Sequence, residues 1–443
     1  MYSGSSSDLF RRFALPQMIG LLFNSIYIIV DGLFIGNRLG RDAMAAAAVG
    51  VPLVEILISL SMMIASGAGI IISESLGRGD DRSANRAFNT AVLTAGIFGI
   101  AIMIFGNLFI DPIAKVLGST ESIHEMAVTY IRYIITFSPF MLYSYLLGGM
   151  VRNDGRPKLA MSALTVGSLS NILLDYVFMY PLNMGIGGAA LATAIGPIIS
   201  DGLLLPHFIR HKGKLSFSRA SIRVSETARI LKLGVPSFVM EFTIGIVTFV
   251  YNTAIGAYGF GEIGLAAYLV IGYLMLIILT LFLGFAEGLQ PVFSYLTGTG
   301  EADRCEALRR YAAKIFILTG LISYVLILLF SRGFYQLFTP GDPELTDFMV
   351  SRSRPYFAGF FLAGYNILMI SYWQSTDRPR QALILSLLRS VIFPPILTAL
   401  LPRVFGSEAL WLCHSLSECL SAGAAGLMAD ELKKETAKKF LTT

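Results

Sequence analysis

Long apolar segments recur along this chain, and they constrain its fold more than any other feature. At a rise of about 1.5 Å per residue, each is long enough to cross the roughly 30 Å hydrocarbon core of a bilayer as an α-helix. They are apolar on all sides and do not alternate as the strands of a membrane barrel do. The twelve predicted spans are approximately residues 13–36, 46–73, 87–110, 126–150, 159–182, 186–209, 233–258, 263–297, 311–331, 346–373, 381–402 and 406–429. The chain is therefore predicted to be an all-α integral membrane protein.

Composition excludes several other classes of protein. Only 14% of the 443 residues are charged and 55% are hydrophobic, whereas soluble proteins carry roughly 25% charged residues. The absence of a clustered basic face argues against nucleic-acid binding, and the absence of a GxxxxGK[ST] loop argues against ATP as an energy source. The three cysteines form no CxxC pair, so we expect no metal site. We predict a protein that is not an enzyme, has no cofactor and acts as a monomer in contact with membrane lipid.

Basic residues indicate how the chain is oriented. Twelve spans put both termini on one side of the membrane, and most lysines and arginines fall in the segments on that same side. Those segments contain Arg11, Arg12, Arg78, Arg82, Arg86, Arg152, Arg156, Lys158, the stretch 210–232, Arg304, Arg309, Arg310, Lys314, Arg378, Arg380, Lys433, Lys434, Lys438 and Lys439. Because cytoplasmic loops carry the excess of basic residues, both termini are predicted to be cytoplasmic, in the cell's inner (plasma) membrane.

The chain contains an internal repeat. Several features recur, in order, at a nearly constant shift along the chain, and four such matches together are stronger than any single Gly or Pro. The matched features are Pro16 and Gly36 with Pro236 and Gly256, the turns 77–80 and 298–301, the turns 154–158 and 376–380, and Arg132 with Arg354. We predict an N-terminal six-helix lobe (1–209), a cytoplasmic linker (210–232) and a C-terminal six-helix lobe with a short basic tail (233–443). The two six-helix bundles would be related by a pseudo-two-fold axis along the membrane normal.

Polar residues on three spans of the first half are candidates for a cation site. Asn24 and Asp31 are two helical turns apart and share a face of the first span, which Pro16 allows to bend. On the fifth span, Asn171 and Asp175 are four residues apart and also share a face. Thr193 lies early in the sixth span. Two carboxylates close together in a low dielectric cannot both ionise cheaply, so such a pair would bind a proton.

The repeat indicates that these acids have a functional role and are not required by the fold. At the same shift, Asp31 corresponds to Tyr251 and Asp175 to Leu397, so the second half has no matching acid pair. The alternative is that both acids sit at helix ends and are wetted by the outer interface.

Further embedded polar residues could line a substrate cavity or a gate. In the second half these are Glu241, Glu287, Gln290 and Arg389. Either Glu241 or Glu287 could line a C-terminal cavity, although Glu241 could equally be an interfacial carboxylate near the cytoplasmic end of its span. Arg389 would pair with an acid or line the central cleft. Tyr130, Tyr143 and Tyr145 could supply aromatic walls that favour lipophilic cations. Other embedded charged candidates are Glu55, Asp201 and Glu418.

Several motifs resemble those of the MATE (multidrug and toxic compound extrusion) family of the MOP flippase superfamily, and the resemblance covers nearly the whole chain. The resemblance is carried by residues 29–36 with 39–40, 77–79, Arg152 with Gly155, 188–193, 234–236 and 290–291. In the DinF-type branch, the N-terminal lobe holds an aspartate in helix one and Asn-x-x-x-Asp in helix five. Asp31, Asn171 and Asp175 match these positions, and Thr193 and Tyr130 complete the resemblance.

The resemblance implies antiport. H⁺ or Na⁺ would enter while a cationic or amphipathic organic compound leaves, and protonation of Asp31 would be linked to a bend near Pro16. The alternative function is a flippase for a lipid-linked saccharide, a related fold that needs a large basic cleft for pyrophosphate. Only Arg389 suggests such a cleft here, and preferential binding of a lipid-linked saccharide would favour that alternative.

Overall fold

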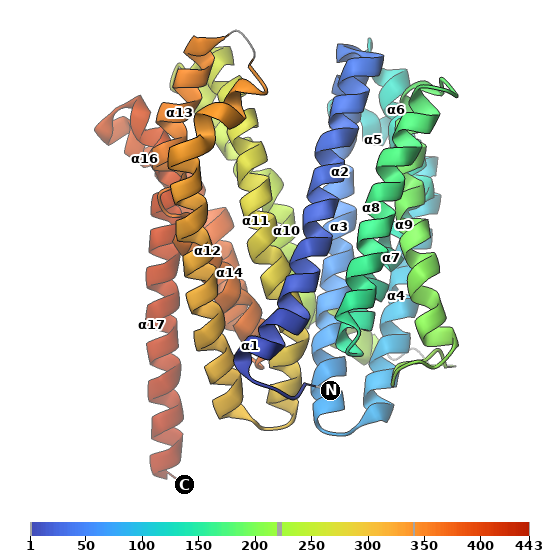
Figure 1. The fold of residues 1–443 in the computed structure, drawn as a ribbon, viewed down its shortest axis with the longest axis vertical. Coiled ribbons are helices and arrows are strands. Elements are labelled where there is room, and N and C mark those ends of the chain that lie inside the picture. The colour runs from blue at the N-terminus through green and yellow to red at the C-terminus, as the bar shows by residue number, and fades with distance from the viewer. Residues whose placement is uncertain (1, 219–223, 340–341, 443) are drawn as a thin grey trace. The chain divides into compact units, whose positions relative to one another are not determined.

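The computed structural model describes residues 2–218, 224–339 and 342–442, and these ranges are helical apart from short turns. The first half contains α1 (Ser6–Leu9), η1 (Phe10–Ala14), α2 (Leu15–Leu39), α3 (Arg41–Gly77), α4 (Asp81–Leu108), α5 (Ile110–Val116), α6 (His124–Thr136), α7 (Ser138–Asn153), α8 (Pro157–Met179) and α9 (Gly185–Ile209). The second half contains α10 (Val224–Ala257), α11 (Gly261–Gly298), α12 (Ala302–Gln336), α13 (Pro343–Phe357), α14 (Phe360–Ser375), α15 (Pro379–Leu387), η2 (Leu388–Ile392), α16 (Phe393–Phe405), η3 (Ser407–Leu412) and α17 (Cys413–Thr442). The long helices run side by side within each part of the molecule (Figure 1).

Each of the twelve predicted spans falls on helix. Among the described residues, nine helices are long and apolar enough to cross a membrane, and the number is ten if α6 and α7, which are bent by 48° at their junction, count as one span. Pro139 follows that junction, and a proline cannot donate the backbone hydrogen bond that would continue the helix. The two remaining predicted spans, on α13–α14 and on η3–α17, contain more polar residues and do not reach the same hydropathy.

The chain packs as two compact units. Unit 1 comprises Met1–Phe242 and Glu287–Cys305, and unit 2 comprises Thr243–Ala286 and Glu306–Thr443. α10 and α11 are therefore each divided between the units. These units follow packing, whereas the predicted lobes follow chain order, and the lobe boundaries at 209 and 233 stay a prediction.

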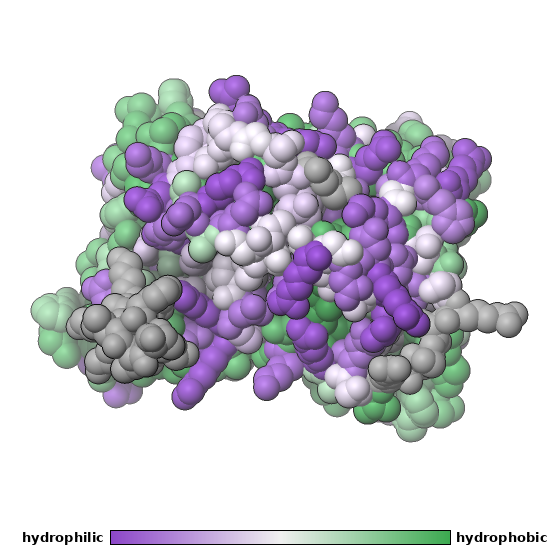
Figure 2. Space-filling view, turned by 90° about the horizontal axis from the view of Figure 1, so that it is seen from below, coloured by the Kyte–Doolittle hydropathy of each residue, from purple (hydrophilic) through white to green (hydrophobic). Residues whose placement is uncertain are grey.

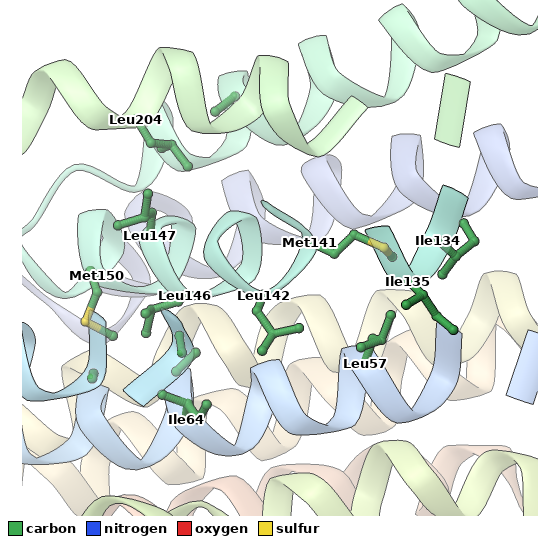
Figure 3. Packing of buried hydrophobic residues seen from close by; sticks show 14 of the residues in the cluster. Leu57, Ile64, Ile134, Ile135, Met141, Leu142, Leu146, Leu147, Met150 and Leu204 are labelled. Carbon is green, nitrogen blue, oxygen red and sulfur yellow. The ribbon is translucent and has the colours of Figure 1, made fainter. Parts of the chain in front are cut away.

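The core of unit 1 is a layer of aliphatic side chains between helices. Leu57 and Ile64 on α3 are fully buried, as are Leu142 and Leu146 on α7. Figure 3 shows Leu142 and Leu146 on the side of α7 that faces α3. Because lipid tails are as apolar as these side chains, close packing rather than a hydrophobic driving force holds such helices together.

Glycines allow the closest contacts in unit 1, and they follow the repeat. A Cβ on Gly67 would lie 1.9 Å from the Ile230 carbonyl oxygen, and one on Gly288, its counterpart in the repeat, would lie 2.5 Å from the Phe13 carbonyl oxygen. A second pair behaves in the same way: a Cβ on Gly77 would lie 2.4 Å from the Tyr295 oxygen, and one on Gly298 would lie 2.1 Å from the Glu74 oxygen. The inner ends of these helices therefore pack with local two-fold symmetry.

The repeated turns share a backbone conformation. Gly79 and Gly300 have φ values of 77° and 76°, in the left-handed region that favours glycine. After the first of these turns, Asp80 caps α4 by accepting a hydrogen bond of 2.9 Å from the Ser83 amide. Hydrogen bonds from the Ser83 side chain and backbone hold the pKa of Asp80 below its usual value.

The face that carries these turns is hydrophilic. Seen from below, many of the residues on this face are hydrophilic (Figure 2). One surface contact there joins Lys214 to Asp81 at 2.9 Å. The distribution is that of helix ends leaving a bilayer for water.

Candidate functional site

The predicted acidic pair meets inside unit 1. Asp31 on α2 and Asp175 on α8 lie close enough for their carboxyl groups to share one proton. Asp175 is fully buried, and Asn171, one turn before it on α8, is 2% exposed. For Asp175, this burial contradicts the alternative in which the acids are helix-end residues wetted by the outer interface.

Thr193 and Tyr130, which were predicted together with the acids, lie beside them. Thr193 on α9 is 9% exposed and its side chain interacts with the hydroxyl group of Tyr130 on α6. Tyr130 is close enough to interact electrostatically with both acids, and so is Tyr27, which lies one turn before Asp31 on α2. We call Asp31, Asn171, Asp175, Thr193 and Tyr130 the acidic cluster.

Small residues explain why these helices come so close. A Cβ on Gly167 of α8 would lie 2.2 Å from the Ser200 hydroxyl oxygen on α9, and one on Gly196 would lie 3.2 Å from the Gly167 carbonyl oxygen. On the other side of the cluster, a Cβ on Gly50 of α3 would lie 2.8 Å from the Tyr130 ring. Helices that approach at glycines can bring short polar side chains into contact.

The cluster has unsatisfied polar atoms. Among the described residues, both carboxyl oxygens of Asp175, one of Asp31 and both side-chain polar atoms of Asn171 are buried without a hydrogen-bond partner. An ionised carboxylate can only accept hydrogen bonds, so two of them cannot satisfy each other. A proton shared between them, or a cation ligated by their oxygens, would remove this cost.

The oxygen-rich donor set fits a small hard cation better than a transition metal. No group of three or more His, Cys, Asp and Glu side chains suited to a metal ion occurs in the described part of the chain. Na⁺ would be held by the carboxylates of Asp31 and Asp175 with the Asn171 carbonyl and the Thr193 hydroxyl.

A cavity adjoins the cluster. Its empty volume is about 480 Å³, and its lining includes Asn24, Tyr27, Asn171 and Thr193 together with aliphatic side chains such as Ile58. We call it the outer chamber. Asn24 therefore faces the same space as the cluster, as its helical spacing from Asp31 predicted. Sequence analysis missed Tyr27, although its position one turn before Asp31 was a usable signal.

A second polar group lies at the other end of this region. Gln17 on α2 donates a hydrogen bond of 2.7 Å to the Glu287 carboxylate on α11, and the Arg152 guanidinium lies 3.6 Å from the same oxygen. These residues line a cavity with an empty volume of about 420 Å³, which we call the inner chamber. Glu287 was expected to line a cavity of the second half, but it faces one in unit 1, because the inner end of α11 packs there.

Three further predicted residues, Pro16, Gln290 and Glu241, lie outside the acidic cluster. Pro16 is buried at the start of α2, directly after the π-helical turn η1, and has no N–H for the helix ladder. Gln290 donates a hydrogen bond to the Ser66 hydroxyl, at the α3–α11 contact. Glu241, 8% exposed on α10, lies within electrostatic reach of Glu287 and Glu55.

Arg389 is not brought to the acidic cluster. It lies in unit 2, where its guanidinium is 2.8 Å from the Glu418 carboxylate. Asn366 donates a further hydrogen bond of 2.8 Å to Glu418. Of the two expectations for Arg389, pairing with an acid is the arrangement found. Asp201 is also buried away from the cluster, and both its carboxyl oxygens have no hydrogen-bond partner among the described residues.

A family model matches this chain twice. The MatE model covers residues 16–177 and again 236–399, which together make up most of the sequence. The offset between the two matches agrees with the shift found in the sequence. This chain belongs to the MatE family. It is a multi-pass membrane transporter, not an enzyme.

Curated relatives of this MATE protein span its whole length. The multidrug export protein MepA of Staphylococcus saprophyticus is 23% identical over 435 residues, covering 97% of this chain and 95% of that protein. MepA of Staphylococcus aureus is 25% identical over 437 residues, with the same coverage of each.

Solved MATE structures share the fold. A crystal structure of MATE in the straight conformation matches with a TM-score of 0.92 at 22% identity and covers 99% of this chain and 98% of that one. One in the bent conformation matches with a TM-score of 0.90 at 22% identity and the same coverage. The predicted fold class, twelve transmembrane helices in two six-helix bundles, is confirmed by this likeness.

Proposed function

We propose that this MATE protein is a secondary active multidrug exporter, which exchanges H⁺ for cationic or amphipathic organic compounds. The observation that carries the proposal is the buried pair of Asp31 and Asp175, whose carboxyl oxygens have too few hydrogen-bond donors around them. A pair of this kind holds a proton or a cation whenever it is sealed from water. The names of the MepA relatives, which are multidrug export proteins, support export as the direction.

The outer chamber supports an organic cargo. Its walls combine aliphatic side chains with the Tyr27 ring and the amide groups of Asn24 and Asn171. An amphipathic compound with a positive charge would bury its apolar part here and place its charge near the acids.

Exchange follows from competition for the same carboxylates. When Asp31 and Asp175 are ionised, they attract the cationic cargo from the chamber. When a proton or Na⁺ binds between them, that attraction is lost, and the cargo is released. A bend of α2 near Pro16, where the helix ladder lacks one hydrogen bond, would close the chamber after release.

The protein would lie in the plasma membrane with both termini in the cytoplasm. The basic residues around the α3–α4 turn and along the 210–232 stretch support this orientation. Protons would then enter from outside, down their gradient, while cargo leaves.

Transport driven by a pH gradient in inverted membrane vesicles tests the proposal. We expect Asp31→Asn and Asp175→Asn each to abolish ΔpH-driven efflux of a lipophilic cation such as ethidium, because an amide cannot exchange a proton. Asp201→Asn is the matched control, since Asp201 is also a buried aspartate in a span of unit 1 but lies outside the cluster. A Na⁺ titration at fixed pH separates the two coupling ions. Full ΔpH-driven transport in both cluster variants would show that the assigned site is wrong.

A further inference from the structure

The inner chamber adjoins the outer chamber within unit 1. Four residues line both chambers and therefore form a wall that the chambers share: Ser144, Tyr145, Leu164 and Ser200. The outer chamber reaches the acidic cluster, and the inner chamber reaches Glu287. The two spaces adjoin at this wall, to which Tyr145 belongs.

Acidic side chains lie around Tyr145, in the wall of the inner chamber. Glu287 lines it directly, and the carboxyl groups of Glu55 and Glu241 also lie within electrostatic reach of the Tyr145 hydroxyl. Against these three acids stands the guanidinium of Arg152, which is 8% exposed. Both Gln17 and Arg152 approach the same oxygen of Glu287, Oε2. The other oxygen, Oε1, has no hydrogen-bond partner among the described residues and is not enclosed by protein atoms.

The repeat shows that packing alone does not need this acid. Gln17 corresponds to Ser237 in the repeat, and Glu287 corresponds to Ser66. The Ser237 hydroxyl donates a hydrogen bond of 2.9 Å to the Ser66 hydroxyl, so the helix contact is kept there by two neutral groups. A carboxylate at position 287 costs more to bury than a hydroxyl group. Its presence on one side of a symmetric contact indicates a ligand.

We propose that the inner chamber is a second subsite for the organic cation, with Glu287 as its counter-charge. The inference rests on the proposed function, because it takes organic cations as the cargo. Tyr145 provides an aromatic face for such a compound beside the Glu287 carboxylate. The cation binds first beside Glu287, on the side of the hydrophilic helix ends, and passes Tyr145 to reach the acidic cluster.

Two positions on α3 distinguish the chambers. Ile58 lines only the outer chamber, and Met62, one turn later, lines only the inner chamber. Both side chains are partly buried. The experiment uses the full chain with its own cysteines, Cys305, Cys413 and Cys419, replaced by alanine. This cysteine-free chain must still export ethidium. Ile58→Cys and Met62→Cys are then introduced into it separately. The purified proteins in lipid nanodiscs are then treated with a small methanethiosulfonate reagent at increasing ethidium concentrations.

We expect ethidium to protect both cysteines from modification. Adding Glu287→Gln should raise the ethidium concentration needed for half-maximal protection of Met62→Cys by about tenfold or more. A carboxylate beside a bound cation in a poorly hydrated site strengthens binding by at least that factor. The same change should leave the protection of Ile58→Cys within about twofold. Glu125→Gln, which alters an exposed acid on α6, is the matched control and should change neither value.

The outcomes separate this inference from the proposed function. If ethidium protects Ile58→Cys but never Met62→Cys, the inner chamber is not a subsite, while the outer chamber keeps its role. If Glu287→Gln leaves the protection of Met62→Cys unchanged, Glu287 is not the counter-charge and the inference fails. If neither cysteine is protected, both the inference and the assignment of the substrate cavity are wrong. ΔpH-driven transport by the Asp31→Asn variant then tests separately whether Asp31 couples export to the proton gradient.

Discussion

At the scale of single residues, the two halves of the repeat use the same positions in opposite ways. In unit 1, Gly167 and Gly196 let α8 and α9 touch and leave room for the outer chamber. The repeat equates these glycines with Arg389 and Glu418 of unit 2, whose side chains form a buried ion pair. Asn366, which corresponds to Ser144 of the chamber wall, bonds to the same carboxylate at 2.8 Å. In unit 2, charged side chains thus occupy the positions that correspond to the outer chamber of unit 1.

The ion pair gives a prediction about stability. Arg389→Met alone should destabilise the protein by about 3–5 kcal/mol, because it leaves the Glu418 carboxylate buried without its partner. The double variant Arg389→Met with Glu418→Leu should recover most of that loss, since no buried charge remains. Thermal unfolding of the purified protein in detergent measures both. A double variant as unstable as the single one would contradict the prediction.

At the scale of helices, glycine positions decide how closely α3 can pack. Gly67 lies against the backbone of α10 near Ile230, and Gly77 lies against the backbone of α11 near Tyr295. Backbone atoms cannot move aside as the end of a flexible side chain can. The inner half of α3 is therefore fixed by contacts that admit no side chain.

Adding one methyl group at such a contact should be costly. Gly67→Ala would place a Cβ 1.9 Å from the Ile230 carbonyl oxygen, and we expect a destabilisation of about 1–3 kcal/mol from overpacking. Gly32→Ala on α2 is the matched control, because nothing lies within 4 Å of its Cβ position. Thermal unfolding and the yield of folded protein compare the two. Equal stability of both variants would show that α3 and α10 do not pack in this way.

At the scale of the whole molecule, the balance of basic residues determines the side on which each loop lies. Lys214 lies in the segment after α9, and Ser122 lies in the turn before α6, on the opposite side of the predicted membrane. Because the long helices cross the bilayer in an order fixed by the sequence, the location of one loop determines that of the others.

Cysteine labelling tests the proposed orientation. In the cysteine-free chain, a membrane-impermeant maleimide should label Ser122→Cys in right-side-out spheroplasts and Lys214→Cys only in inverted vesicles. Both positions are exposed, so a lack of access through burial does not confuse the result. Permeabilised cells, in which both should be labelled, serve as the control. The reverse pattern would mean that the termini are outside.

Much of the acidic cluster could be read from spacing along helices. Asn171 and Asp175 are one turn apart, so they share a face in any helix, and Asn24 and Asp31 are two turns apart. Glu287 was harder to place. Its helix belongs to the second half, and only contacts through Gly288 and Gly298 bring the inner end of that helix into unit 1.

By itself, the sequence determined that this chain is a bundle of membrane-spanning helices built from a duplicated half, because hydrophobic length and the order of glycine and proline turns are local properties. The tertiary structure alone decided which polar groups share a chamber. That choice depends on which helix faces touch, and touching is controlled by backbone contacts between residues such as Gly67 and Ile230 that lie far apart in the chain. A periodic pattern shows which face of a helix is polar, but the partner of that face is set by packing.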